Sequence, residues 1–354
     1  MTEGRAWNWK KAARAALSVA IIVVVFVGVL PQVADFGDVW RQIRSMTPLE
    51  VSSLAIAAGW NLLTYLFVIV PASPGLTYPQ AFVMTQSTTA VSNSVPGGAA
   101  IGIGLTYAMY SSWGFSKGDS ALAILVSGVW NNFAKLGMPV LALALLALQG
   151  DASAPRVTAG LAGIAMLAAA VGVFALMLRS DGAARRVGTV AGRVASGVRR
   201  LARRPPVEGW GEAAAEFRGR TVRLLRRAWL RLTVGTVVSH LSLYLVLLLA
   251  LRHVGVSERD VGWVEVLAVF AFIRLLSALP VTPGGLGVVE LGLTAGLVAA
   301  GGEESKVVAA VLVYRALTYL LPIPLGMATY VVWRRNTSWR RPTALDPADA
   351  PAVP

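Results

Sequence analysis

The chain has 354 residues, of which 56% are hydrophobic and 14% are charged, and its formal net charge is +14. In a soluble domain roughly a quarter of the residues are charged. This composition therefore excludes an ordinary soluble protein and indicates an all-α polytopic membrane protein. The chain contains no cysteine and two histidines, which excludes disulfides and thiolate chemistry and gives no basis for expecting a metal site or a cofactor.

The first predicted transmembrane helix is an apolar run at residues 15–30, preceded by a basic segment at 1–14. A cleaved signal peptide is the alternative, and it is weaker because the following sequence PQVADFG is a poor cleavage site. Further spans are predicted from long apolar stretches, each long enough to cross the ~30 Å hydrocarbon core of a bilayer. These spans are 49–70, 120–149, 157–178, 229–251 and 305–333.

Two other apolar segments, 78–110 and 263–300, are each interrupted near the middle by Pro-Gly-Gly. The break leaves helices of about 15 residues, or ~22 Å at 1.5 Å per residue, which is short for a crossing. Each segment is therefore predicted to be a re-entrant hairpin that enters and leaves the membrane on the same side. Two shallow, tightly packed spans are the alternative.

The two hairpins belong to a predicted internal repeat. The Pro-Gly-Gly motif at 96–98 aligns with the motif at 283–285, and LGMP aligns with LPIP at nearly the same offset. Each repeat, 49–149 and 229–333, consists of a span, a broken hairpin and a span, and the single span between them inverts the second copy. Inverted repeats with broken helices are typical of secondary transporters. A duplication kept only for packing is the alternative.

The excess positive charge is concentrated at residues 179–228, where 13 arginines stand against four acidic residues, a net charge of +9. Because cytoplasmic segments are rich in arginine and lysine, we expect a cytoplasmic Arg-rich loop here, between membrane halves at 15–178 and 229–333. Both termini are then cytoplasmic, the segment 151–156 is external, and 334–354 is a disordered tail. The expected location is the inner or plasma membrane, and nucleic acid is not an expected partner.

The chemistry of the two breaks indicates an anion site. Proline removes a backbone donor, glycine permits a sharp turn, and the break leaves unpaired N–H groups at the positive end of the second half-helix. A lipid phosphate is able to approach such groups where glycines leave room; tight helix packing by small residues is the alternative. The candidate residues are Pro96, Gly97, Gly98, Pro283, Gly284, Gly285 and Gly287.

Charged residues inside predicted membrane segments are costly and are therefore candidates for function. They are Lys135, Arg274, Glu290 and Arg315. Glu290 is expected to face a polar cavity or to pair with Arg274 or Arg315. Three cations against one carboxylate leave a positive excess that suits an anionic headgroup. Asn131 and Asn132 stand one turn before Lys135 and are candidates for the same cavity.

Three stretches resemble the flippase-like transmembrane region of lysylphosphatidylglycerol synthases and related stand-alone membrane proteins: LPVTPGGLGVVE, NSVPGG and WNNFAKLGMPVLALALL. The resemblance extends over nearly all of 15–333. The residues that match the family motif Pro-Gly-Gly-x-Gly-x-x-Glu are Pro283, Gly284, Gly285, Gly287 and Glu290. The resemblance implies that this membrane region moves a charged lipid between leaflets. Because bifunctional members carry a soluble aminoacyl-transferase domain after this region and the sequence ends about 20 residues past the last span, lipid aminoacylation by this chain alone is not expected.

These observations predict a flippase-like transporter, not an enzyme, that moves an anionic lipid or a lipid-linked precursor between leaflets by alternating access. Lys135, Arg274 and Arg315 are expected to hold the phosphate, with Glu290 orienting an arginine or exchanging a proton. The expected partners are anionic membrane lipids, and a homodimer is left open. One alternative is a glycosyltransferase acting on polyprenyl-phosphate lipids, disfavoured because such chemistry usually needs several carboxylates. Another is a non-catalytic partner of a separate lipid-modifying enzyme.

Overall fold

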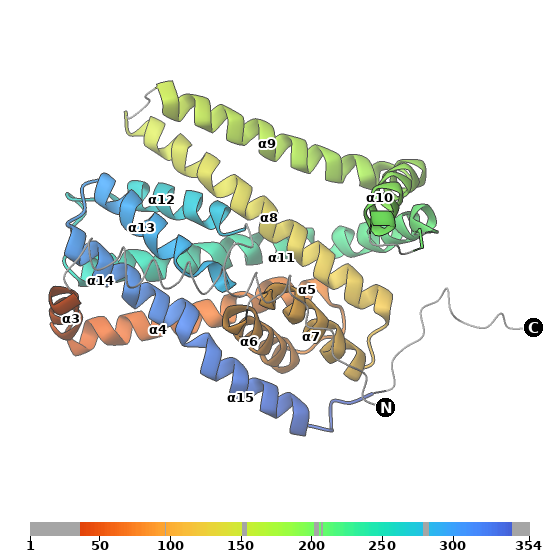
Figure 1. The fold of residues 1–354 in the computed structure, drawn as a ribbon, viewed down its shortest axis with the longest axis horizontal. Helices are drawn as coiled ribbons and strands as arrows, with labels where there is room; N and C mark the ends of the chain where they lie inside the picture. The colour runs from red at the N-terminus through yellow and green to blue at the C-terminus, as the bar shows by residue number, and fades with distance from the viewer. Residues whose placement is uncertain are drawn as a thin grey trace, which may run out of the picture.

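A computed structural model of the chain describes residues 36–95, 97–150, 154–201, 205–206, 208–278 and 283–341. The described part of the chain is built from helices, which Figure 1 colours along the sequence. The basic N-terminus, the predicted span at 15–30 and the predicted tail beyond residue 341 lie outside the described residues.

The helices follow one another along the chain, and they include a short 3₁₀ helix, η2, and a π-helical turn, η3. They are α3 (Phe36–Arg44), α4 (Pro48–Thr64), α5 (Leu66–Ala72), α6 (Tyr78–Ser94), α7 (Gly98–Ser112), α8 (Lys117–Leu148), α9 (Ala154–Arg179), α10 (Asp181–Leu201), α11 (Trp210–His253), α12 (Trp263–Leu276), η2 (Pro283–Gly285), α13 (Val288–Ala299), α14 (Glu304–Arg315), η3 (Ala316–Leu320) and α15 (Pro322–Arg335).

Several helical segments are long and apolar enough to cross a membrane. Within the described residues they are Pro48–Ala72, Lys117–Leu148, Arg156–Arg179, Trp210–His253 and Glu304–Arg335. They match the spans predicted after the first one, and they confirm an all-α polytopic membrane protein. The main difference is α11, which begins at Trp210 instead of residue 229, because its arginine-rich N-terminal part is also helical.

The arginine-rich segment at 179–228, predicted to be a loop, is formed largely by α10 and the first half of α11. Small side chains let the two helices approach closely. A Cβ atom added at Gly188 would overlap the carbonyl oxygen of Trp210, and one added at Gly211 would lie 2.9 Å from the Thr189 hydroxyl. Arginine is a good helix former, so a high density of arginines is compatible with helix in this segment. Its cytoplasmic location stays a prediction.

Both Pro-Gly-Gly sequences separate two helices, as predicted. α6 begins at a capping box between Thr77 and Gln80, and α7 begins after Gly97, whose φ of +73° favours glycine. η2 separates α12 from α13. The four helices α6, α7, α12 and α13 have 17, 15, 14 and 12 residues, so at 1.5 Å per residue none reaches ~30 Å. The re-entrant path of these hairpins in a bilayer stays a prediction.

Helices from the two membrane halves pack against each other reciprocally. α11 packs on α4 and α5, α6 packs on α15, and α12 packs on α8. Glycines permit the closest approaches: a side chain at Gly235 would overlap the Phe67 backbone, and one at Gly326 would overlap the Gln86 carbonyl oxygen. Each broken hairpin therefore packs on the helix that closes the other predicted repeat, α15 for the first hairpin and α8 for the second.

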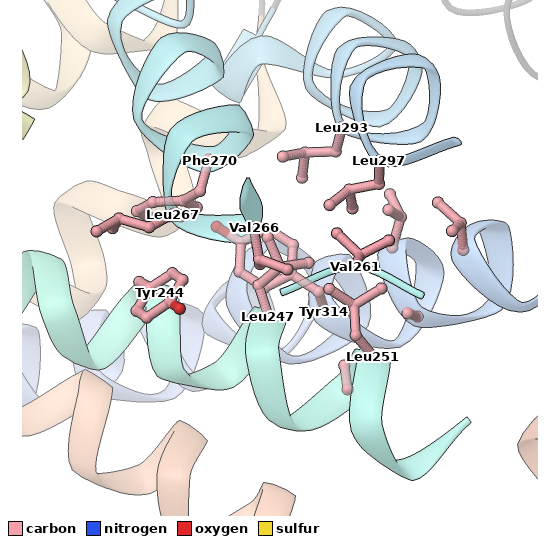
Figure 2. Packing of buried hydrophobic residues seen from close by; sticks show 14 of the residues in the cluster. Tyr244, Leu247, Leu251, Val261, Val266, Leu267, Phe270, Leu293, Leu297 and Tyr314 are labelled. Carbon is pink, nitrogen blue, oxygen red and sulfur yellow. The ribbon is translucent and has the colours of Figure 1, made fainter. Parts of the chain in front are cut away.

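The largest buried apolar cluster lies where α11, α12, α13 and α14 meet. Figure 2 shows Leu247 and Leu251 of α11, Phe270 of α12, Leu293 of α13 and Tyr314 of α14 in this cluster. Lipid tails are as apolar as these side chains, so the cluster stabilises the fold mainly through close packing. The packing fixes α13 against α14 and thereby brings the carboxylate of α13 to the arginine of α14.

Candidate functional site

The candidate site is centred on Glu290, in the first turn of α13, whose side chain is 0% exposed. One carboxylate oxygen accepts the backbone N–H of Gly287 at 2.7 Å and thereby caps the start of α13. The other oxygen accepts the Nε–H of Arg315 at 2.6 Å. The prediction that Glu290 pairs with an arginine is confirmed, and the arginine is Arg315.

Arg315 holds the second break against α14. Besides binding Glu290, its guanidinium donates to the carbonyl oxygen of Gly284 at 3.3 Å. The guanidinium also lies over the ring of Tyr319, 4.2 Å from the ring centroid, as in a cation–π contact. Its side chain is 11% exposed. One arginine therefore fixes both the turn at Gly284 and the start of α13.

Tyr319 carries the contact to the first hairpin. Its hydroxyl donates to the backbone carbonyl of Asn93 at 2.6 Å, and the Asn93 amide donates to the backbone carbonyl of Tyr319 at 3.1 Å. Gly284 lies against both residues, since a Cβ atom there would overlap the Tyr319 ring and lie 2.9 Å from Asn93 Oδ1. The two broken hairpins meet at this point, which leaves no room for a side chain at Gly284.

The π-helical turn η3 begins directly after Arg315 and contains Tyr319. Its wider geometry is visible in the hydrogen bond from the Leu321 N–H to the Ala316 carbonyl oxygen, five residues earlier, at 2.9 Å. Pro322 follows, and a proline has no N–H and crowds the carbonyl four residues before it, which favours a wider turn here. Single π turns are frequent at functional sites.

Two further cations lie near this pair. Arg274 of α12 is close enough to interact electrostatically with Arg315, with Lys135 of α8 and with His240 of α11. Within the described part of the chain, Arg274 Nε is buried without a hydrogen-bond partner, and no carboxylate forms an ion pair with Arg274 or Lys135. Since Glu290 already binds Arg315, the site carries a positive excess, as the sequence predicts.

His240 of α11 is a buried polar residue that interacts electrostatically with Arg274 and Lys135. Its Nδ1 lies 3.0 Å from the carbonyl oxygen of Thr236, which only accepts, so Nδ1 carries the proton in this contact. The other ring nitrogen, Nε2, is buried and has no hydrogen-bond partner among the described residues. A histidine in an apolar span is usually a packing residue, so the sequence did not make His240 a candidate for the site.

At the N-terminus of α13, a carboxylate of the protein itself contacts one of the backbone N–H groups of the second break. The carboxylate of Glu290 already accepts the Gly287 N–H and occupies the place expected for a phosphate. Pro283 begins η2, and Gly285 and Gly287 have φ values of +70° and +84°, so these residues shape the turn. The binding roles predicted for Pro283, Gly284, Gly285 and Gly287 stay predictions.

The first break differs from the second in that the helix after it has no acidic residue in its first turn. α7 begins at Gly98 with no acidic residue in its first turn, and a Cβ atom at Gly98 would overlap the carbonyl oxygen of Val91. Pro96 lies outside the described residues. On α8, one turn from Lys135, Asn131 is half-buried and Asn132 is exposed. The binding roles predicted for these residues stay predictions.

Asn93 and Tyr319 are the two contact residues that sequence analysis missed. Tyr319 stands four residues after Arg315, the spacing at which side chains share a helix face, so its place near the site had a local signal. Asn93 had a weaker signal, since it stands two residues before Val95 at the start of the first break. Their contact across 226 residues depends on the packing of α6 on α15.

Comparison with known protein families places the site in a recognised membrane region. The family model described as "Lysylphosphatidylglycerol synthase TM region" matches residues 15–326. No curated protein matches the chain. The matched segment contains both broken hairpins, the Glu290–Arg315 pair and the neighbouring cations, and it corresponds to the membrane region of these synthases without a catalytic domain. The chain therefore belongs to the lysylphosphatidylglycerol synthase transmembrane-region family.

Proposed function

We propose that the protein is a flippase-like transporter that moves an anionic lipid, or a lipid-linked precursor, between leaflets of the inner or plasma membrane by alternating access. The chain is a multi-pass membrane protein of a lipid-related family, and this membership supports a lipid as the substrate. In the proposal both termini are cytoplasmic, since the arginine-rich segment favours that side.

The positive excess at Lys135 and Arg274 carries the proposal. A charged side chain at the bilayer centre costs about 2.5–3.5 kcal/mol even on the lenient insertion scale, so two cations without a described carboxylate partner need another anion. The guanidinium of Arg274 offers a planar set of donors suited to phosphate, and the Lys135 ammonium adds a point charge. A lipid phosphate between α8 and α12 meets both requirements.

The reciprocal packing of the two halves supports alternating access. In the proposal, the helix pairs α6–α15 and α12–α8 are equivalent contacts of an inverted repeat, so each hairpin moves against the closing helix of the other half. The first hairpin approaches the second at Asn93 and Gly284, and Asn93 also forms two hydrogen bonds with Tyr319 of η3. These two hydrogen bonds stabilise the closed contact by about 1 kcal/mol each. Substrate binding is able to offset the loss of this stabilisation when the contact opens.

The test compares the double variant Lys135→Gln/Arg274→Gln with Arg334→Gln/Arg335→Gln, which removes two positive charges at the end of α15. Thermal unfolding in detergent, with and without added phosphatidylglycerol, is measured beside movement of a fluorescent anionic lipid in reconstituted vesicles. We expect the site variant to be at least as stable as wild type without lipid, because like charges no longer repel. We expect it to lose both the stabilisation by anionic lipid and the lipid movement.

Two results would count against the proposal. If the site variant unfolds at a clearly lower temperature than the control, the two cations have a structural role and the binding argument fails. If the wild type moves no anionic lipid under any imposed ion gradient, transport fails as the function. A role in polyprenyl-phosphate chemistry, or as a partner of a separate enzyme, then gains support.

A further inference from the structure

α10 carries an exposed apolar stripe that the transport site does not use. Val187, Val190 and Val194 recur at three- and four-residue spacing and therefore share one face of the helix. They are 42%, 54% and 64% exposed. The opposite side of α10 is formed by small buried residues such as Ala184 and Gly188 and packs on α11. The valines are therefore not the face that joins α10 to the rest of the protein.

A separate face of the same helix is basic. Arg186, Arg193 and Arg200 recur at seven-residue spacing, and α10 contains five arginines against one acidic residue, Asp181. That carboxylate is already paired with Arg218 of α11 at 2.8 Å. Helix α10 thus has a face for α11, an apolar face and a cationic face.

Two acidic residues of the neighbouring segment lie near the end of the cationic face. Glu208 and Glu212 line a cavity of about 710 Å³ together with Arg193 and Arg200. Two carboxylates against five arginines leave α10 and its surroundings positive. Arg186, farther toward the start of the helix, is not among the residues that line this cavity.

The position of α10 fits a membrane surface. α9, a membrane-spanning segment, ends at Arg179, and α10 begins two residues later at Asp181. In Figure 1 α10 is seen nearly end-on, whereas α8, α9 and α11 extend across the view. The axis of α10 therefore runs across the axes of the membrane-spanning helices, which is the direction of the bilayer plane. A helix in this orientation stays at the level of the headgroups along its whole length.

We propose that α10 is an interfacial helix whose partner is the anionic lipid surface on the side where α9 ends. The three valines enter the boundary between headgroups and acyl chains, and the arginines bind lipid phosphates beside them. A helix with an apolar face and a basic polar face binds in this way, with strength set by the buried apolar area and by the anionic lipid content. A neutral lipid surface would accept the valines but would offer no anionic headgroups to the arginines.

The test uses single-cysteine variants of the full chain, which contains no native cysteine. Val190→Cys reports on the apolar face, and Thr189→Cys is the comparison, because Thr189 is exposed on another face, where it borders the cavity beside α11. Each variant carries a bimane probe in vesicles of phosphatidylcholine alone or with phosphatidylglycerol. Quenching by aqueous iodide and by lipid-borne nitroxide is measured only for variants that elute as a single species.

We expect the probe at 190 to be quenched by nitroxide and shielded from iodide in the phosphatidylglycerol vesicles, and the probe at 189 to be open to iodide. In Arg186→Gln/Arg193→Gln, the ratio of lipid-facing to water-facing probe should fall by about fivefold for each arginine removed. Equal iodide access at both positions, immersion that is independent of phosphatidylglycerol, or shielding of position 190 from both quenchers would each overturn the proposal. The last result would indicate a protein partner on the valine face.

Discussion

Removing the carboxylate of the buried ion pair is expected to destabilise the protein strongly. Glu290→Gln keeps the size of the side chain and its ability to accept one hydrogen bond, but it leaves the Arg315 guanidinium without a counter-charge. The two side chains are 0% and 11% exposed, so water replaces little of the lost interaction. Breaking a buried pair in this way costs about 3–5 kcal/mol.

For a chain of this length a loss of 1 kcal/mol lowers the unfolding midpoint by roughly 2 °C. We therefore expect Glu290→Gln to unfold about 6–10 °C below wild type, measured by intrinsic tryptophan fluorescence in a mild detergent.

A double-mutant cycle separates the pair from general disruption of the site. Glu290→Gln combined with Arg315→Gln should be less destabilising than the sum of the single changes, with a coupling of roughly 1–3 kcal/mol. The matched cycle with Arg274→Gln should show a much smaller coupling, because Arg274 makes no described hydrogen bond with Glu290. A wild-type midpoint for Glu290→Gln, or stronger coupling to Arg274 than to Arg315, would refute the assignment of the pair.

Two further predictions concern the breaks and the topology. Gly97→Ala and Gly284→Ala both place a side chain at a positive φ, of +73° and +57°, which costs about 1–2 kcal/mol. The space at Gly97 is open, whereas a Cβ atom at Gly284 would overlap the Tyr319 ring. Gly284→Ala should therefore be the more destabilising change and should reduce lipid movement more; equal effects in both assays would contradict the contact between the hairpins. In intact cells, an impermeant maleimide should label Gln149→Cys and should label Gly197→Cys only after permeabilisation. The reverse pattern would invert the proposed topology.

The amino-acid pattern was sufficient for the features that depend on local composition. Long apolar stretches predicted the spans from 49–70 onward, and Pro-Gly-Gly predicted where the hairpins break, because neither signal needs knowledge of distant residues. The pairing of Glu290 with an arginine was also predictable, since an unpaired carboxylate in a membrane is costly. The motif around Glu290 pointed to the family as well.

The identity of each partner depended on how the helices pack. Arg274 and Arg315 were equal candidates by sequence, and α13 packs against both helices that carry them. Only the placement of side chains between α13 and α14 brings the Glu290 carboxylate to Arg315. The contact between Asn93 and Tyr319 requires α6 to lie on the last span, because the two residues are 226 positions apart. Periodicity and charge describe one segment at a time, whereas a hydrogen bond at 2.6 Å requires two segments to be placed to within a fraction of an ångström. Only the close packing of helices from both halves sets that distance.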